Sequence, residues 1–354
     1  MHMALAGLLL AVPLSAAAAD LSLHIDADGY AEPVSIQDFT HHWQGRFSGG
    51  RHAFLQGRAE LTRRDVGQEV SLLWRYDYLL DFTPDTAELY NAYAKGLAPD
   101  TGRAYGLGVT ARYSEALGVR WSPVFQWRPG LTVTPGFNLL QGYKLTDGGL
   151  GGSARFRQPG FSGADFQGAD LAVDYHYDEP QLYEEKLGWH PRNPDGWGYS
   201  LDLRADWRPD DRRSLTLQLY DVYGRLHWRQ APRTQYQFDY QAVPAAHQLT
   251  GQLATDTHYT QVLPMRGRLS GDYRLNERWQ AGWQLDANRY VRLGQVSAGY
   301  SVGAWTGSLL WEPQTGALGV ALAHPGFRCR WLADSLNTNR ARRLGISLAA
   351  ETSW

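Results

Sequence analysis

The chain has 354 residues, and 34 Lys and Arg against 36 Asp and Glu give a formal net charge of −2. This balance excludes recognition of nucleic acid or another polyanion through bulk positive charge. The single cysteine, Cys329, excludes an intramolecular disulfide and a cysteine-based zinc site, and its surroundings predict a small apolar filler.

The first residues have the composition of a secretory signal peptide. Residues 3–14 are almost wholly apolar, and Ala16–Ala19 place small residues before Asp20, as in an h-region followed by a cleavage site. A membrane-spanning helix needs about 20 apolar residues, so this stretch is too short to be one. We therefore predict a signal peptide over 1–19, a periplasmic lead-in over 20–41 and one domain over 42–354.

Segments of alternating polarity, separated by turn residues, run from about residue 42 to the end, without a long amphipathic helix. Side chains alternate between the two faces of a strand, so each such segment predicts a strand with one apolar and one ionisable face. The clearest segments are 105–113, 171–177, 199–207, 265–273, 327–331 and 344–354.

Two all-β architectures produce this alternation: a soluble sandwich with its apolar faces inward, and a membrane barrel with its apolar faces outward. The chain has 14 Trp, 20 Tyr and 38 Gly with a low mean hydropathy. Its aromatic residues gather at strand ends, beside turns such as 127–130 and 207–210. Aromatic belts at the two membrane interfaces explain that placement. We therefore favour the barrel and assign Trp127, Trp207, Tyr273 and Trp305 as interface anchors.

The turns support a barrel in which the last strand ends on the periplasmic side. Counting backwards from it places the short turns 127–130, 208–213, 275–278 and 323–326 on that side. The longest connections, 178–196 and 230–261, then fall outside, as membrane barrels require. The count is about 16–18 antiparallel strands. It falls to about 16 if the irregular pieces 43–48 and 85–95 are not strands, and 14 is possible.

The last strand carries the most specific signal. Leu344, Ile346, Leu348 and Trp354 share one face, and the chain stops on the aromatic residue. This pattern resembles the closing strand of bacterial outer-membrane β-barrels. The resemblance implies a closed transmembrane barrel in the outer membrane of a Gram-negative bacterium, in contact with lipid. It also implies that Ile346, Leu348 and Trp354 are recognised by the barrel-insertion machinery.

If the apolar faces meet lipid, the charged faces line the lumen. Barrels of 16–18 strands normally enclose an aqueous channel, so we expect opposed Arg and Asp side chains to select small polar solutes. The pairs Arg266/Arg268 and Arg328/Arg330 each stack two cations and would favour anions locally. The alternative is a narrow lumen filled by ion pairs. The selectivity candidates are Arg112, Asp202, Arg204, Asp206, Arg266, Arg268, Asp272, Arg328 and Arg330.

Catalysis and metal binding have weaker signals. His176 with Asp174 or Asp178, and His227 near Asp221, are the nearest approach to the acid–base pairs of barrel hydrolases. The acidic stretch 176–185 could offer carboxylates to a divalent cation, although a solvated loop explains it better.

The sequence thus predicts a porin-like channel for passive diffusion of small hydrophilic solutes or ions, with no cofactor, metal or nucleic-acid partner and with its oligomeric state open. A non-conducting structural or assembly barrel of a secretion or surface-polymer system is the first alternative. An outer-membrane barrel hydrolase is the second.

Overall fold

The computed structural model of the protein describes residues 20–41, 43–182, 184–243, 245–337 and 339–353; the predicted signal peptide and Trp354 lie outside these described residues. Its helices are α1 (Ile36–Thr40), α2 (Pro84–Lys95) and two short 3-10 helices, Gly163–Asp165 and Glu184–Leu187. Its strands are β1 (Asp20–Ala31), β2 (His52–Asp65), β3 (Gln68–Phe82), β4 (Ala104–Pro123), β5 (Phe125–Arg128), β6 (Leu131–Phe156), β7 (Phe166–Tyr177), β8 (Asp195–Trp207), β9 (Arg213–Ala242), β10 (Ala245–Val262), β11 (Arg266–Arg274), β12 (Trp279–Ala287), β13 (Arg292–Val302), β14 (Trp305–Glu312), β15 (Ala317–His324), β16 (Phe327–Ala333) and β17 (Arg343–Ser353).

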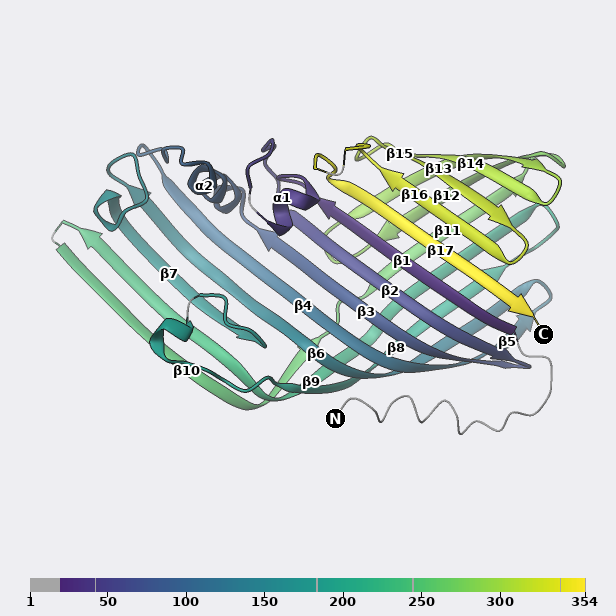
Figure 1. Cartoon of the computed structure of the whole chain (residues 1–354), viewed down its shortest axis with the longest axis horizontal. Coiled ribbons are helices and arrows are strands. Elements are labelled where there is room, and N and C mark those ends of the chain that lie inside the picture. The colour runs from purple at the N-terminus through teal and green to yellow at the C-terminus, as the bar shows by residue number, and fades with distance from the viewer. Residues whose placement is uncertain (1–19, 42, 183, 244, 338, 354) are drawn as a thin grey trace.

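Backbone pairing closes these strands into an antiparallel barrel with 14 strand positions (Figure 1). β7 and β8 share one position, because both pair with β6 and β9. β10 and β11 share another, because both pair with β9. β4 and β5 share a third, because both pair with β6. β1 pairs with β2 on one side and with β17 on the other, which completes the ring. The predicted closed barrel is confirmed. It has 14 strand positions, below the expected 16–18.

The predicted lead-in over 20–41 is wrong, because its first 12 residues form β1. Ile25 lies opposite Leu348 of β17 and opposite Ala59 of β2. Leu21 and Leu23 lie on the outward face and are 37% exposed. Residues 20–31 therefore have the same alternation as the later strands, and their backbone groups are paired on both sides.

The two irregular pieces are not strands. Residues 43–48 carry no strand, and 85–95 lie in α2, the amphipathic helix that the sequence reading missed. Local signals explain this helix. The Thr83 side chain accepts a hydrogen bond from the backbone N–H of Thr86, and Pro84 occupies the first helical position. Gly96 ends the helix with a φ of 65°, a conformation that glycine adopts without strain.

The two faces of the barrel wall have opposite polarity, as predicted. On β3, Arg75 and Asp77 are 2% and 4% exposed and point inward. On the neighbouring β4, Leu117 and Trp121 are each 48% exposed and point outward. An apolar exterior around a charged interior is the arrangement of membrane-spanning barrels and the reverse of a soluble sandwich. Other large outward-facing side chains are Leu139, Trp207, Trp283, Leu309, Trp311 and Leu318.

The short turns predicted for the periplasmic side all lie at one end of the barrel, where β17 also ends (Figure 1). The two predicted external loops are corrected. Residues 230–261 belong mostly to β9 and β10, which pair along their length as a hairpin. Residues 178–182 and 184–194 leave the sheet between β7 and β8 and do not join two strands at the rim. The interface role of the aromatic anchors stays a prediction, although Trp127, Trp207 and Trp305 are 70%, 46% and 46% exposed near these turns.

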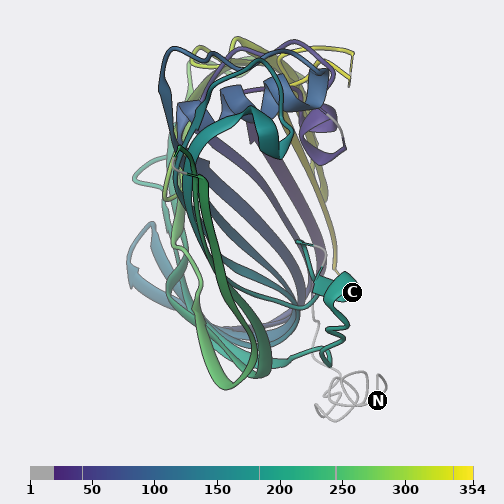
Figure 2. The ribbon, with the colours of Figure 1, turned by 90° about the vertical axis from the view of Figure 1, so that its left-hand side faces the viewer.

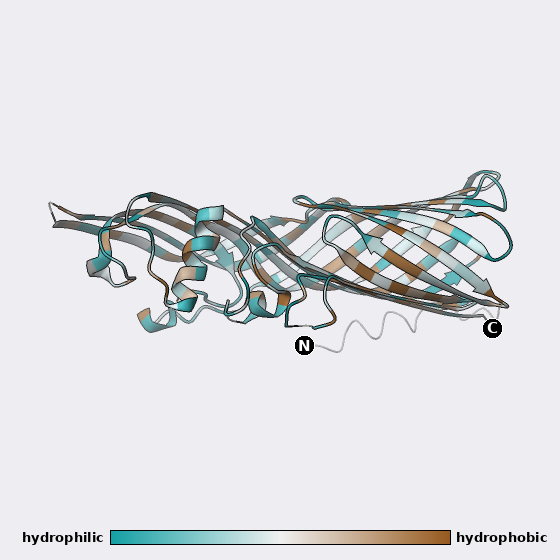
Figure 3. Ribbon diagram, turned by 90° about the horizontal axis from the view of Figure 1, so that it is seen from above, coloured by the Kyte–Doolittle hydropathy of each residue, from teal (hydrophilic) through white to brown (hydrophobic). Residues whose placement is uncertain are grey.

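One side of the barrel is much taller than the other. β6 and β9 have 26 and 30 residues, whereas β14, β15 and β16 have eight, eight and seven. A bilayer crossing takes only about 9–11 residues of a strand. We call the excess the extension: residues 104–113, 144–156, 166–177, 229–242 and 245–262. Figures 2 and 3 show it continuing beyond the closed part of the barrel, with the helices on one side of it.

The helices pack on the outward face of the taller wall. Ala87 of α2 and Trp43 lie in one apolar cluster with Ala53 and Phe82 of the sheet. The inward face has its own apolar cluster around Trp228, which is 1% exposed. A Cβ added at Gly196, on the neighbouring strand, would come within 2.5 Å of the Trp228 ring, so this position requires glycine. None of the described helices combines the length and hydropathy needed to cross a membrane.

Candidate functional site: the charged lumen

Buried charges from nearly every part of the barrel wall meet inside it. Seven arginines face eight carboxylates in a set that we call the lumenal belt. Its members are Asp26, Asp28, Arg58, Glu60, Arg75, Asp77, Arg120, Asp202, Tyr220, Asp221, Arg266, Arg268, Asp286, Glu312, Arg330 and Arg343.

The first half of the belt joins β2, β3 and β4 to β8 and β9. The Arg75 guanidinium donates to both carboxylate oxygens of Asp221, at 2.6 and 2.8 Å. Arg58 donates to Asp202 at 2.8 Å and also to Glu60. Arg75, Arg58 and Asp221 are all at most 3% exposed. These bonds connect walls that are four strand positions apart, so they cross the interior.

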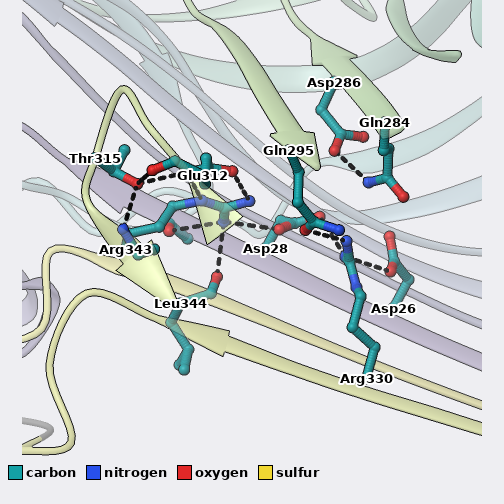
Figure 4. A network of polar contacts seen from close by, with 12 residues as sticks. Asp26, Asp28, Gln284, Asp286, Gln295, Glu312, Thr315, Arg330, Arg343 and Leu344 are labelled. Carbon is teal, nitrogen blue, oxygen red and sulfur yellow. Dashed lines mark hydrogen bonds and ion pairs between the residues drawn. The ribbon is translucent and has the colours of Figure 1, made fainter. Parts of the chain in front are cut away.

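The second half is centred on Asp28 of β1 (Figure 4). Arg343 donates to Asp28 at 2.8 Å and to Glu312 at 2.9 Å. Arg330 approaches the carboxylates of Asp26 and Asp28 at 3.9 Å and donates to Gln295 at 3.4 Å. β14, β16 and β17 are thereby held to β1 through the same small group of acidic side chains.

Arg268 of β11 connects opposite walls. Its guanidinium lies 3.2 Å from Asp26 and 3.1 Å from Asp28 of β1, and it donates to Asp286 at 2.6 Å. β1 and β11 are seven positions apart in the ring of 14, which is as far apart as two strands can be. Arg268 and these aspartate side chains together therefore bridge the lumen.

Tyr220 joins the two halves. Its ring lies between the guanidinium groups of Arg58 and Arg266, 4.7 and 4.6 Å from the ring centroid, within the range of cation–π attraction. The cavity beside it, lined by Phe54, Gln56 and the Arg268 cluster, has a volume of about 40 Å³. A single water needs roughly 10–15 Å³ of such space. This cavity beside Tyr220 therefore has room for a few waters.

The belt contains four of the nine predicted selectivity residues, namely Asp202, Arg266, Arg268 and Arg330. Four others lie further along the same strands toward the β17 end, in a second layer below the belt. Arg204 and Asp206 pair there at 2.7 Å and are partly exposed, and Asp272 and Arg328 complete the layer. Arg112 lies above the belt, 3.8 Å from Asp147.

The expected anion preference of the two arginine pairs is not supported. Arg268 and Arg330 both face Asp26 and Asp28, and the Arg266 guanidinium packs on Tyr220. Carboxylates therefore face one arginine of each pair. The sequence reading missed them because β1 was taken as a lead-in.

Other members of the lumenal belt were not predicted from the sequence, for different reasons. Asp221 has a φ of 54° and lies where the register between β8 and β9 shifts, so simple alternation gives the wrong face. Arg343 and Glu312 are each the single charged residue at one end of a largely apolar strand. A charge on an otherwise small-residue inward face is the signal that could have identified them.

The two histidine sites considered for catalysis do not form as expected. His176 pairs with Asp256, at 2.8 Å, and its ring stacks on Tyr259. His227 contacts Trp197 and Thr260, while Asp221 is buried against Arg75. In the acidic stretch, Asp178 pairs with Lys144 and Glu184 is fully buried. The described residues hold no group of three metal-ligating side chains.

No protein-family model and no curated protein sequence matches the chain. Among solved structures it resembles a deletion mutant of the TodX monoaromatic hydrocarbon channel (10% identity, 95% and 90% of the two chains, TM-score 0.46). It also resembles the Pseudomonas putida toluene transporter TodX (9%, 95% and 89%, 0.43) and a Pseudomonas aeruginosa FadL homologue (11%, 95% and 88%, 0.30). At these values the barrel assignment rests on the strand pairing of this chain, and its function on its own residues.

Proposed function

We propose that the protein is an outer-membrane channel of a Gram-negative bacterium whose lumen is closed by the lumenal belt in the state described. Small polar solutes or ions would pass only when the belt rearranges. The proposal is supported by a closed barrel with an apolar exterior and an interior lined by charged groups. The proposed channel is gated, unlike the permanently open pore that the sequence predicted.

The observation that carries the proposal is the contact of Arg268 with Asp26 and Asp28 on the opposite wall. A barrel that only needed filling could use apolar side chains, and these would be at least as stable as buried ion pairs. Charged side chains that bridge the lumen can instead exchange partners with water and with passing ions. Arg268 can move aside without unfolding the wall to which it is attached.

A non-conducting structural barrel is the second candidate, because the same sealed lumen fits a protein that only anchors other components. The two candidates differ in what happens when the belt is weakened. A gate opens more often, while a structural filler loses stability and conducts only as a damaged barrel.

Planar-bilayer recordings test the proposal on the full-length protein and on Arg268→Gln, with Arg204→Gln as the matched control. Arg204 is also a lumenal arginine, but it pairs within its own strand. In Arg268→Gln the carboxylates of Asp26, Asp28 and Asp286 lose their shared cation and repel one another. We expect the wild type to show rare, discrete openings of reproducible conductance.

We expect the open probability in Arg268→Gln to rise by about tenfold, which corresponds to ~1.4 kcal/mol against the closed state. The unitary conductance should be kept and Arg204→Gln should gate like the wild type. Total silence of the wild type at every voltage, together with irregular leaks in Arg268→Gln, would support the structural barrel. A large, steady conductance of the wild type would contradict a closed belt.

A further inference from the structure

A second cavity lies on the outside of the barrel wall and not in the lumen. Its walls are Tyr78 and Leu80 of β3, Ala111 and Tyr113 of β4, and Leu150 and Val173 of β6 and β7. Residues 178–182, which leave the sheet after β7, cover it. Its volume is about 510 Å³, within the range of roughly 300–1,000 Å³ that holds a small organic ligand. We call it the outer cavity.

Strand alternation places this cavity on the membrane side of the wall. Tyr113 and Ala111 have the same parity on β4 as Leu117, which is 48% exposed on the outward face. On β3, Tyr78 has the opposite parity to the inward-facing Arg75 and Asp77. The cavity therefore lies on the same outward face of the wall as the apolar exterior. It is in the extension, above the bilayer. A molecule outside the barrel can therefore reach it without entering the lumen.

The covering segment is held in place by buried polar contacts. Glu184 is fully buried and accepts hydrogen bonds from Tyr175, from Thr234 at 2.9 Å and from the backbone N–H of Leu182 at 2.7 Å. Burial and the neighbouring Glu184 raise the pKa of Tyr175, so its hydroxyl remains a donor. These contacts hold the covering segment against the sheet.

The polar end of the cavity carries an excess of negative charge. Lys144 is its cation; its ammonium group lies 3.0 Å from Asp178 and also pairs with Glu179. Asp178 accepts a further hydrogen bond from the backbone N–H of Leu145 at 3.0 Å, whereas the Glu179 side chain is 67% exposed. Two carboxylates face one ammonium group. An anionic ligand is therefore repelled, and a neutral or cationic group that donates hydrogen bonds is accommodated.

From this geometry we infer that the outer cavity binds a small, mainly apolar molecule with an aromatic or aliphatic ring body and an uncharged or cationic polar end. Three tyrosines and six aliphatic side chains provide the apolar walls. The inference goes beyond the proposed channel, because none of these residues belongs to the lumenal belt.

Two probes with the same ring system test the inference: uncharged N-phenyl-1-naphthylamine and its anionic sulfonate, 1-anilinonaphthalene-8-sulfonate. Their fluorescence is titrated against the full chain in lipid nanodiscs. Ala111→Trp fills the cavity, and Ala281→Trp adds the same bulk to the outward face of β12, far from it. Empty nanodiscs give the contribution of probe dissolved in lipid.

We expect the uncharged probe to bind wild type and Ala281→Trp at one saturable site per chain, and Ala111→Trp to lose that site. The sulfonate should bind roughly tenfold more weakly, since like charges repel, and Glu179→Lys should reduce that difference. Equal saturable binding by wild type and Ala111→Trp, with both variants folded by heat-modifiable migration in gels, would overturn the inference. So would no saturable binding by the wild type. Arg268→Gln should bind the probe normally, so a failed channel and a failed cavity are distinguishable.

Discussion

Arg343 of β17 and Glu312 of β14 are joined by two hydrogen bonds, 2.9 and 3.2 Å long, and both side chains are 1% exposed. The strands that carry them are three positions apart in the ring, with β15 and β16 between. Arg343 also donates to Asp28 of β1. The last strand is thus fixed by side chains across the interior as well as by its backbone pairing with β1.

Removing one member of this buried pair should destabilise the barrel strongly. In Arg343→Met, Glu312 loses its cation while it remains buried, and breaking such a pair typically costs about 3–5 kcal/mol. Adding Glu312→Leu should restore part of the loss, because no uncompensated charge remains. Urea unfolding of the single and double variants in lipid measures this. A double variant no more stable than Arg343→Met would contradict the explanation.

The first strand should be essential for assembly. Ile25→Pro removes a backbone donor in the middle of β1, which is paired on both sides. We expect this variant to fail to form the compact species that migrates faster in unheated gels. Val66→Pro is the control, because Val66 lies in a tight turn and is 99% exposed. If Ile25→Pro folded as readily as Val66→Pro, residues 20–31 would after all be a dispensable lead-in.

The apolar exterior should tolerate a charge only beyond the bilayer. Leu309 on the short strand β14 and Leu249 on β10 are similarly exposed, at 70% and 65%. Leu309→Arg places a cation against acyl chains at a cost of roughly 2–4 kcal/mol. Leu249→Arg, in the extension, should cost little. Reversible folding into vesicles gives both values, and equal values would mean that the extension is also embedded.

The extension should loosen as the pH rises. Burial raises the pKa of Asp147 above its ordinary value of 3.8, so the folded extension favours the protonated carboxyl. At low pH both the folded and the unfolded states are protonated and there is no penalty. As the pH rises through the folded-state pKa, the folded state loses stability.

Hydrogen exchange of residues 144–156 measures this effect. In the wild type it should be slower at pH 4 than at pH 7 after correction for the intrinsic rate. Asp147→Asn, which cannot ionise, should remove the difference. A wild type whose protection increases with pH would show that Arg112, 3.8 Å away, outweighs burial.

Much of the barrel was predictable because period-two alternation is local. The segments 105–113, 171–177 and 199–207 all lie in strands, and their apolar faces point outward. The helix at 84–95 was missed because these residues were assigned to a strand from the period-two pattern of their neighbours. Thr83, Pro84 and Gly96 nevertheless mark the ends of a helix. β1 was missed because it directly follows an apolar leader.

The contacts across the lumen could not be predicted in the same way. Alternation says that Arg268 faces inward, but not that β11 lies opposite β1 at a distance that an Arg–Asp pair spans. That distance depends on the number of strand positions and on the flattening of the barrel, which are properties of the whole ring. The outer cavity likewise requires residues 78–182 to come together from four strands and a covering segment.

Between β7 and β8 the chain leaves the sheet, so it can be cleaved there without breaking any strand. Each of these strands pairs independently with β6 and β9. A protease cut at residues 190–194, after the last contact of Trp189 with Tyr177, severs the polypeptide without opening a single ladder. The two fragments, separately produced, are therefore expected to complement each other and rebuild an intact membrane protein.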